Sequence, residues 1–519
     1  MKLLCYILIL GTVLTVNAAP KKQAPIVSIG KKKQLVYDRD EHGNRVPDFS
    51  RCGYAGGDQP IPAAPVKVIV DPQPGDSTAR IQAAINYVAS LAPDSNGLRG
   101  AVLLLLGRHE VFGGLQITNS GVVLRGQGAG EDGTILVAAG LDRRTLIRIN
   151  GQNDMVLHSN ADWEIQDDYV PVGATSFQLK DASGLKPGDT IQVVRPSTKA
   201  WIDQLGATEF GGGMGDWRLT WKAGSRDLTW DRMVLSVSNN VVTVDAPITT
   251  AIEKSLGAGR MQAYAWAGRL ENVGVENILL ESTVSATNPI DENHSWCAIT
   301  MENAQNTWVR QVTARHFAGS MVAIYESCQR VTVQDCLSLA PVSEDGGYRR
   351  NTFFTMGQLT LFLRCFSESG RHDFSAGHCA AGPNAFVQCE TSLSLGDSGT
   401  IESWASGVLF DNVRVDGNGL NLMYRGPNGE GAGWSTANSV LWNCDASQIH
   451  CENPPGARNW SFGSWGEFYG DGIWRNSNAN EQPDSLYVAQ LAERIGVRAH
   501  TQAPLMERST KEESNPTVA

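Results

Sequence analysis

The sequence lacks the patterns that mark several common protein classes. After the first twenty residues no apolar run approaches transmembrane length, and no CxxC, HExxH, GxSxG, P-loop or EF-hand pattern occurs. Basic residues are also in deficit: 43 Lys and Arg stand against 54 Asp and Glu, for a formal net charge of −11. A nucleic-acid partner needs a basic footprint. These absences predict a protein with no membrane span and no nucleic-acid partner.

The longest apolar stretch lies at the start of the chain. Residues 1–19 contain Lys2, then about a dozen mostly apolar residues, then small residues before Pro20. This order is typical of a secretory signal peptide. It predicts a secreted or periplasmic mature protein.

A short strand pattern recurs from Val273 to about Ile449. Steps of 35, 24, 29, 24, 23 and 32 residues separate its equivalent positions, which are Asn277, Val312, Cys336, Cys365, Cys389, Asn412 and Cys444. A near-constant minimum step with irregular additions indicates one coil of a solenoid, lengthened by loops. The segments are β-branched and broken by Gly, Asn, Asp or Ser, with no helical period. The repeat predicts an all-β protein built as a parallel β-helix.

The repeat also explains most of the ten cysteines. Four of them share the repeated position, where stacked coils would bury them as small hydrophobic side chains. Asparagines at the same position would form a side-chain ladder. Loss of Cys5 with the signal peptide leaves nine cysteines, an odd number that argues against a complete disulfide framework. Cys444 and Cys451 are the pair best placed to form a disulfide.

The rest of the chain divides around the repeat. Residues 20–65 are polar and predict an extended surface segment, and residues 66–152 predict a helix and the first coils. Residues 153–265 interrupt the coils with antiparallel strand patterns, which predicts a small inserted β subdomain or lid. Residues 266–475 predict the main β-helix, and residues 476–519 a short helix and a polar tail.

The helix expected in residues 66–152 begins at Asp76 or Ser77. Its apolar face would cap the open end of the solenoid through Ile81, Ile85, Val88 and Leu91. The helix expected near the C-terminus has a similar face, made of Leu486, Val488, Leu491 and Ile495.

Three early segments resemble the opening of the pectate-lyase-like superfamily of right-handed parallel β-helix proteins. They are GDSTARIQAAINYVASL, GAVLLLLGRHEV and GVVLRGQGAG. The resemblance implies right-handed coils and a carbohydrate-active protein, but that superfamily includes lyases, hydrolases, epimerases and phage spikes. Neither the paired aspartates of polygalacturonases nor a vxiRxPxD-type motif occurs, so no catalytic residue is carried over.

Three carboxylates recur eight residues beyond the repeated cysteines, at Glu344, Asp373 and Asp397. Neighbouring coils lie about 4.8 Å apart, so these side chains are expected to lie close together. Three interpretations are open. The carboxylates form a Ca²⁺ site, they include the acid and base of a glycosidase, or each pairs with an arginine. Calcium is therefore the one cofactor candidate.

The densest group of acids and bases lies on two consecutive loops. Arg371 or Arg350 is a candidate to neutralise a uronate carboxylate, and His372 or Tyr348 to transfer protons beside Asp373. Glu402 is the alternative general acid. A second group would extend the groove for sugar binding: Trp404, Tyr424, Arg425 and Trp434.

These residues favour a polysaccharide lyase that cleaves an acidic, uronate-containing glycan by β-elimination. A glycoside hydrolase with paired carboxylates is the alternative, and a non-catalytic glycan-binding protein is the second alternative. Cations in the groove would favour the lyase, and carboxylates the hydrolase.

Overall fold

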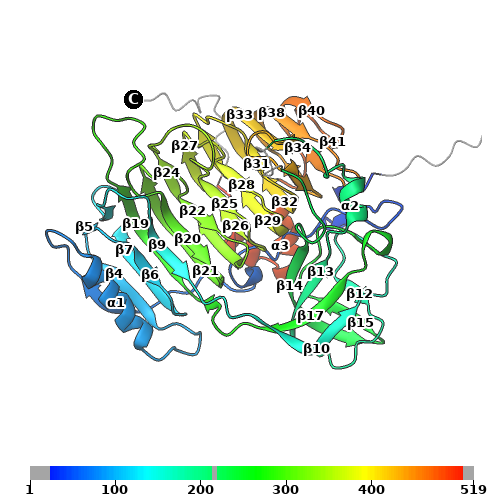
Figure 1. Ribbon diagram of the computed structural model, residues 1–519, viewed down its shortest axis with the longest axis horizontal. Helices are drawn as coiled ribbons and strands as arrows, with labels where there is room; N and C mark the ends of the chain where they lie inside the picture. Colours follow the sequence, from blue (N-terminus) through cyan, green and yellow to red (C-terminus); the bar gives the residue numbers. More distant parts are fainter. Residues whose placement is uncertain (1–23, 213–218, 507–519) are drawn as a thin grey trace, which may run out of the picture.

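The computed structural model describes residues 24–212 and 219–506 of the chain. The predicted signal peptide lies outside these residues. Nearly all of the described chain is strand, turn or loop, and 29 strands join one continuous sheet wound as a right-handed parallel β-helix (Figure 1). The predicted fold class is confirmed. Among the described residues, no helix is long and apolar enough to cross a membrane.

Three stacks of parallel strands form the solenoid wall. The first stack consists of β6 (Leu115–Ile117), β9 (Thr145–Asn150), β20 (Cys297–Glu302), β22 (Val322–Ile324), β25 (Phe353–Thr355), β28 (Phe374–Ala376) and β31 (Ser398–Thr400).

The second stack runs through β3 (Val66–Val70), β4 (Gly100–Leu104), β7 (Val122–Gly128), β19 (Gly274–Ser282), β21 (Ala304–Arg315), β23 (Gln329–Gln334), β26 (Leu361–Leu363), β29 (Ala381–Val387), β32 (Ala405–Asp411), β37 (Val440–Trp442), β39 (Trp460–Phe462) and β41 (Ile473–Arg475). The third stack includes β5 (Gly107–Val111), β8 (Thr134–Ala138), β24 (Leu337–Leu339), β27 (Phe366–Glu368), β30 (Glu390–Ser392), β33 (Arg414–Leu422), β38 (Asp445–Cys451) and β40 (Trp465–Tyr469).

Side chains that point into the solenoid stack from coil to coil. Phe362, Phe386 and Phe410 lie nearly parallel, with ring centroids 4.6 and 5.0 Å apart. Offset aromatic stacks of this kind add to the energy of burial. Repetition of one residue type at one position therefore holds successive coils in register.

The repeated position predicted from the sequence is correct for the cysteines and wrong for the two asparagines. Ile278 pairs with Val312, and Arg414 pairs with both Glu390 and Asp445, so Ile278 and Val413 occupy the column instead. Asn277 and Asn412 precede it and have φ values of 56° and 58°. A coil corner requires this left-handed backbone, which Asn tolerates better than most residues.

The cysteine column is a stack of buried thiols. The nine described cysteines are reduced, so the predicted disulfide between Cys444 and Cys451 is absent. The Cys444 thiol donates to the carbonyl of Phe410 at 3.1 Å, in the corner before β38, whereas Cys451 ends that strand. The strand between them holds the two side chains apart.

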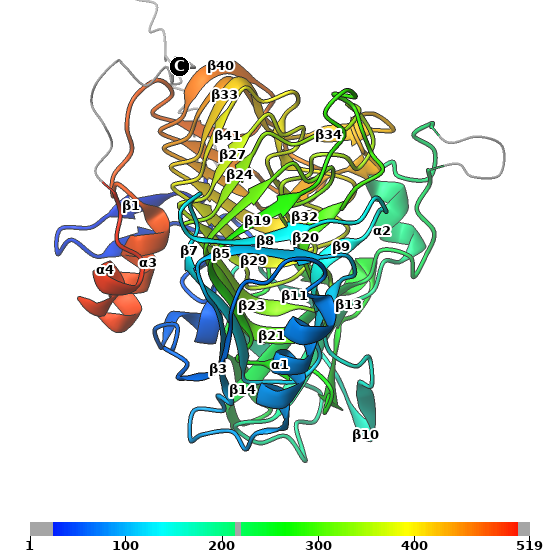
Figure 2. The ribbon, with the colours of Figure 1, turned by 90° about the vertical axis from the view of Figure 1, so that its left-hand side faces the viewer.

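Helices cover the end and one side of the solenoid (Figure 2). Helix α1 (Thr78–Ser90) buries Ile81, Ile85 and Val88 over the first coils, as predicted, and Asp76 accepts a hydrogen bond from the Thr78 amide. Unlike α1, helices α3 (Leu486–Ile495) and α4 (Arg498–Gln502) do not cover an end of the solenoid but pack on the outer face of the second stack. There they meet the N-terminal hairpin of β1 (Val27–Ile29) and β2 (Leu35–Tyr37).

Residues 156–265 form a separate antiparallel sheet beside the solenoid. Its strand order is β10 (Val156–Glu164), β17 (Arg260–Ala265), β13 (Thr190–Arg195), β14 (Leu228–Ser238), β15 (Val241–Val244) and β12 (Ser176–Gln178). With helix α2 (Lys199–Gln204) it has its own hydrophobic core, and we call it the insert (Figure 1).

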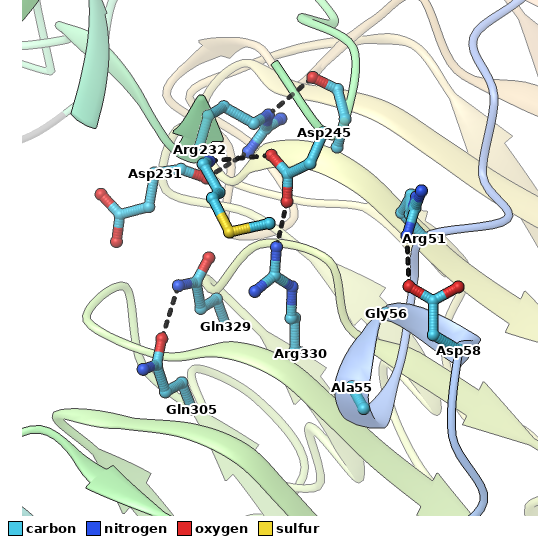
Figure 3. Close-up of polar contacts among 12 residues, drawn as sticks. Arg51, Ala55, Gly56, Asp58, Asp231, Arg232, Asp245, Gln305, Gln329 and Arg330 are labelled. Carbon is cyan, nitrogen blue, oxygen red and sulfur yellow. Dashed lines mark hydrogen bonds and ion pairs between the residues drawn. The ribbon is translucent and has the colours of Figure 1, made fainter. Parts of the chain in front are cut away.

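Buried polar contacts fasten the insert to the coils. Arg232 is 2% exposed and donates all five N–H groups, to the carbonyls of Asp231, Ala246, Pro247 and Gly382 and the side chain of Gln358. Asp245 of the insert forms an ion pair with Arg330 of the coils (Figure 3). Beside it, Gln329 donates to Gln305 on the preceding coil at 2.7 Å. The insert is thus rigidly positioned along the coils.

Candidate functional site

A cleft of about 710 Å³ lies between the insert and the corner that follows the first stack. Five consecutive coils contribute to its floor, which spans about 19 Å at the usual strand spacing of about 4.8 Å. The insert supplies the facing wall through Gln192, Ser225, Arg226, Asp227, Thr229 and Asp231.

The corner places chemically active side chains in one column along this floor. The register aligns Asn303, Glu326, Gly357, His378 and Glu402. Glu402 is therefore one coil from His378 and three coils from Glu326. Four of the five positions follow strands of only three residues, so these side chains leave the sheet where the backbone turns.

Carboxylates dominate the lining of the cleft. Five of its side chains are Asp or Glu, and one is Arg. Asp231 forms a buried ion pair with Arg269 at 2.7 Å, and Asp227 accepts from the amide and hydroxyl of Ser197. Within the described chain, the carboxylates of Glu302 and Glu326 have no hydrogen-bond or ion-pair partner. The cleft therefore carries unneutralised negative charge.

Glu402 lies at one end of the cleft and is the best-supported carboxylate. Its Oε1 pairs with Nη2 of Arg226 on the insert at 3.0 Å. Its Oε2 accepts from the Ser403 hydroxyl and lies 3.7 Å from Nδ1 of His378. These contacts fix the Glu402 carboxylate where coil and insert meet.

His378 is held neutral beside Glu402. Burial lowers its pKa and outweighs the opposing effect of Glu402. The ring stacks on Tyr348, with centroids 6.1 Å apart, and meets the edge of Phe354. The pKa of Tyr348 is raised by burial and by Glu430 and Glu402. Glu402, His378, Tyr348 and Glu430 thus form one group of ionisable side chains in which the charge of one affects the pKa of another.

The backbone of Glu430 lies beside that of Glu402, outside the cleft lining. The Glu402 amide donates to the Glu430 carbonyl at 2.8 Å, so the two residues lie on neighbouring coils. Asn351 donates to Oε2 of Glu430 at 3.0 Å, while Oε1 is buried without a partner among the described residues. Burial raises the pKa of Glu430 to about 7. The two glutamates therefore differ in their surroundings, because Glu402 is ion-paired with Arg226 whereas burial disfavours the charge of Glu430.

Replacing Glu430 with glutamine is expected to stabilise the protein at pH 8. The folded-state pKa of about 7 exceeds the ordinary value of 4.5. The buried charge therefore destabilises the fold fully above pH 7 and not at all below about pH 4.5. The gain should be about 1–3 kcal/mol at pH 8 and vanish near pH 4. Urea unfolding at both pH values measures it. Exposed Glu390→Gln is the matched control, and a gain that is equal at both pH values would contradict the assignment.

The predicted arginines and histidine lie under loops and outside the cleft lining. Arg371 pairs with Asp345 at 2.7 Å, and Arg350 bonds the side chain and backbone of Ser343. His372 is buried, and its Nδ1 lies 2.6 Å from the carbonyl of Asp397. Of the first predicted group, only Tyr348 borders Glu402 and His378.

The three carboxylates predicted as a calcium site point to different partners. Asp373 is fully buried and accepts from the hydroxyls of Ser367 and Ser394, and burial raises its pKa to about 6. Burial disfavours the charge of Asp397, but Arg425, His372 and Asn421 together outweigh this effect and lower its pKa. Glu344 is exposed. No group of three acidic, His or Cys side chains in the described chain is arranged to hold a metal ion.

The aromatic platform predicted at Trp404 is wrong, because this side chain is 1% exposed. It packs between coil and insert, edge-on to Trp201 and Trp221. Arg425 is likewise buried, with Asp397. Tyr424 is 38% exposed and meets half-buried Trp434 at 5.2 Å across the hairpin of β34 (Tyr424–Gly426) and β35 (Gly433–Trp434).

Sequence reasoning found Glu402 but missed Glu326, Asp227 and the pairing with His378 and Glu430. Counting residues from the cysteine column follows one corner of the coil, whereas the cleft lies at another corner. The detectable signal was a carboxylate or histidine two residues after three of the short first-stack strands, as in IYE, SAGH and TIE.

Comparisons with known proteins give architecture alone. No family model matches the sequence, and no curated protein does. Similar solved structures include the tailspike gp61 of Pseudomonas phage phi297 (TM-score 0.41, 12% identity, 77% of this chain and 65% of that one). A second is the tailspike gp49 of Pseudomonas phage LKA1 (TM-score 0.40, 13% identity, 76% of this chain and 69% of that one). A third is a polygalacturonase from Erwinia carotovora (TM-score 0.32, 9% identity, 82% of this chain and 99% of that one). This chain thus spans about two thirds of the first tailspike. Identities and TM-scores are too low to indicate an activity.

Proposed function

We propose that the protein is a carbohydrate-active enzyme, and specifically a glycoside hydrolase. The acidic cleft carries this proposal, since carboxylates dominate it and its one arginine is paired with Glu402. Glycoside hydrolysis needs one carboxylate and one carboxylic acid near the scissile bond. Glu402, which is ion-paired with Arg226, and Glu430, whose pKa burial raises to about 7, are the two candidates, and their backbones lie on adjacent coils.

Glu402 is the base or nucleophile, because its ion pair with Arg226 and its hydrogen bond from Ser403 fix the carboxylate in the cleft. Glu430 is the proton donor, since a raised pKa suits a general acid at neutral pH. The backbones of adjacent coils lie about 4.8 Å apart, and a carboxyl spacing close to that value would make the enzyme a retaining one. Oε1 of Glu430 is buried, so this role requires the substrate to displace the residues that cover it.

The charge of the cleft also favours a class of glycan. Unpaired Glu302 and Glu326 would repel a polyuronate and attract neutral or amino-substituted sugars. This proposal therefore replaces the acidic substrate expected from the sequence. Export to the cell surface or periplasm stays a prediction from the first nineteen residues.

β-Elimination is the second candidate reaction, and one observation favours it. His378 is neutral and stacks on Tyr348, so a base and a phenol acid lie together near Arg226. A lyase would use these three groups to remove a proton, protonate the leaving oxygen and neutralise a uronate.

A panel of neutral, amino-substituted and acidic polysaccharides tests the proposal. We expect new reducing ends from a neutral or amino-substituted chain, with no ultraviolet absorbance from an unsaturated uronate. Absorbance from an acidic chain would establish the lyase. Binding without any product would instead support the non-catalytic glycan-binding protein.

A further inference from the structure

The cleft is closed at the end where Glu402 lies. Arg226 crosses from the insert to pair with Glu402, and Trp221 of the same segment donates to the carbonyl of Ala432 at 2.8 Å. On the other side, Trp404 donates to the hydroxyl of Thr250 at 3.2 Å. Insert and coils are therefore joined directly behind the carboxylate.

The closing wall is solid. Trp201, Trp221 and Trp404 are 2%, 3% and 1% exposed, and their rings contact one another at 5.0 to 6.3 Å. Arg195 stacks over Trp201 at 4.1 Å behind them. A packed core of three indoles leaves no passage for a sugar chain.

The end of the cleft near Glu326 is lined by different residues from the end near Glu402. Glu326 is exposed and Glu302 half-buried, and Trp266 borders them from the base of the insert. A chain that lies along the floor therefore leaves past Glu326 and has its terminal residue against the Trp wall.

From this closed end we infer that the enzyme attacks glycan chains only at one terminus and releases short products. The inference rests on the proposed function, because it places the reacting carboxylate, Glu402, beside the dead end. A cleft open at both ends would admit internal segments, whereas here a chain can reach no further than the coil of Glu430, next to that of Glu402, where Trp221 joins the insert to Ala432.

The experiment uses the full-length protein and a polysaccharide that it cleaves. Chain-length distribution is followed by size-exclusion chromatography while reducing ends are counted. Two further substrate samples are blocked, one by reduction of the reducing end and one by alkylation of the other end. We expect short products from the first time point, a persistent high-mass peak, and no cleavage of one blocked sample.

A rapid fall in chain length, with both blocked samples cleaved as fast as the free chain, would overturn the terminal attack and leave the hydrolase intact. No cleavage of any chain would overturn the proposed function itself. Glu402→Gln in parallel assigns the products to this site, and Glu390→Gln should reproduce the native product pattern.

Discussion

Glu402→Gln is expected to reduce glycan hydrolysis by about 10³-fold or more. The amide is isosteric with the carboxylate but cannot take a proton or attack a sugar carbon. It also loses the ion pair with Arg226 while keeping a hydrogen-bond acceptor for Ser403. Turnover should therefore fall much more than affinity, and initial-rate kinetics separate the two.

The fold should survive this change, because the Glu402 side chain is partly exposed in the cleft and contributes nothing to the solenoid core. Thermal unfolding of the variant should resemble that of the native protein. Exposed Glu390→Gln on the third stack is the control for charge removal. Retained turnover in the Glu402 variant would contradict its role, and a large loss of stability would make Glu402 structural.

Arg232→Met is expected to cost about 3–5 kcal/mol of unfolding free energy. The substitution keeps much of the side-chain length but removes five buried donors. Four backbone carbonyls and the Gln358 amide oxygen then lose the hydrogen bonds that Arg232 donates. These acceptors come from both the insert and the coils, so the insert should detach and the cleft lose its facing wall.

Denaturant unfolding with tryptophan fluorescence measures this effect, since Trp201, Trp221 and Trp230 lie in the insert core. Arg260→Met, at an exposed position of β17, is the matched control and should cost little. If both variants lost the same small amount of unfolding free energy, the hydrogen bonds of Arg232 would not be what holds the insert against the coils. Loss of activity with unchanged stability would argue for a direct role in the cleft.

The fold was largely predictable because the coil repeats. Stacking forces Cys336, Cys365 and Cys389 into equivalent positions, so their spacing reveals the coil length. The register was wrong by one residue at Asn277 and Asn412. An asparagine suits both an internal ladder and a left-handed corner, and only the corner geometry decides between them.

The site was predictable only in part because it forms between distant segments. Glu402 was found from its loop, but Arg226 and Asp227 reach it from an insert about 175 residues earlier. Trp404 was expected to bind sugar, and it is instead buried by Trp201 and Trp221. Sequence spacing along the coils cannot reveal contacts with a separately folded insert.

The central claim is that water cleaves a glycosidic bond beside Glu402. Reaction in water enriched in heavy oxygen, followed by mass spectrometry of the products, tests this claim most directly. Hydrolysis should add one heavy oxygen for each bond cleaved and add none when Glu402→Gln replaces the native protein. Products of the same cleavage that contain no heavy oxygen, and are lighter by one water, would show elimination and contradict the account.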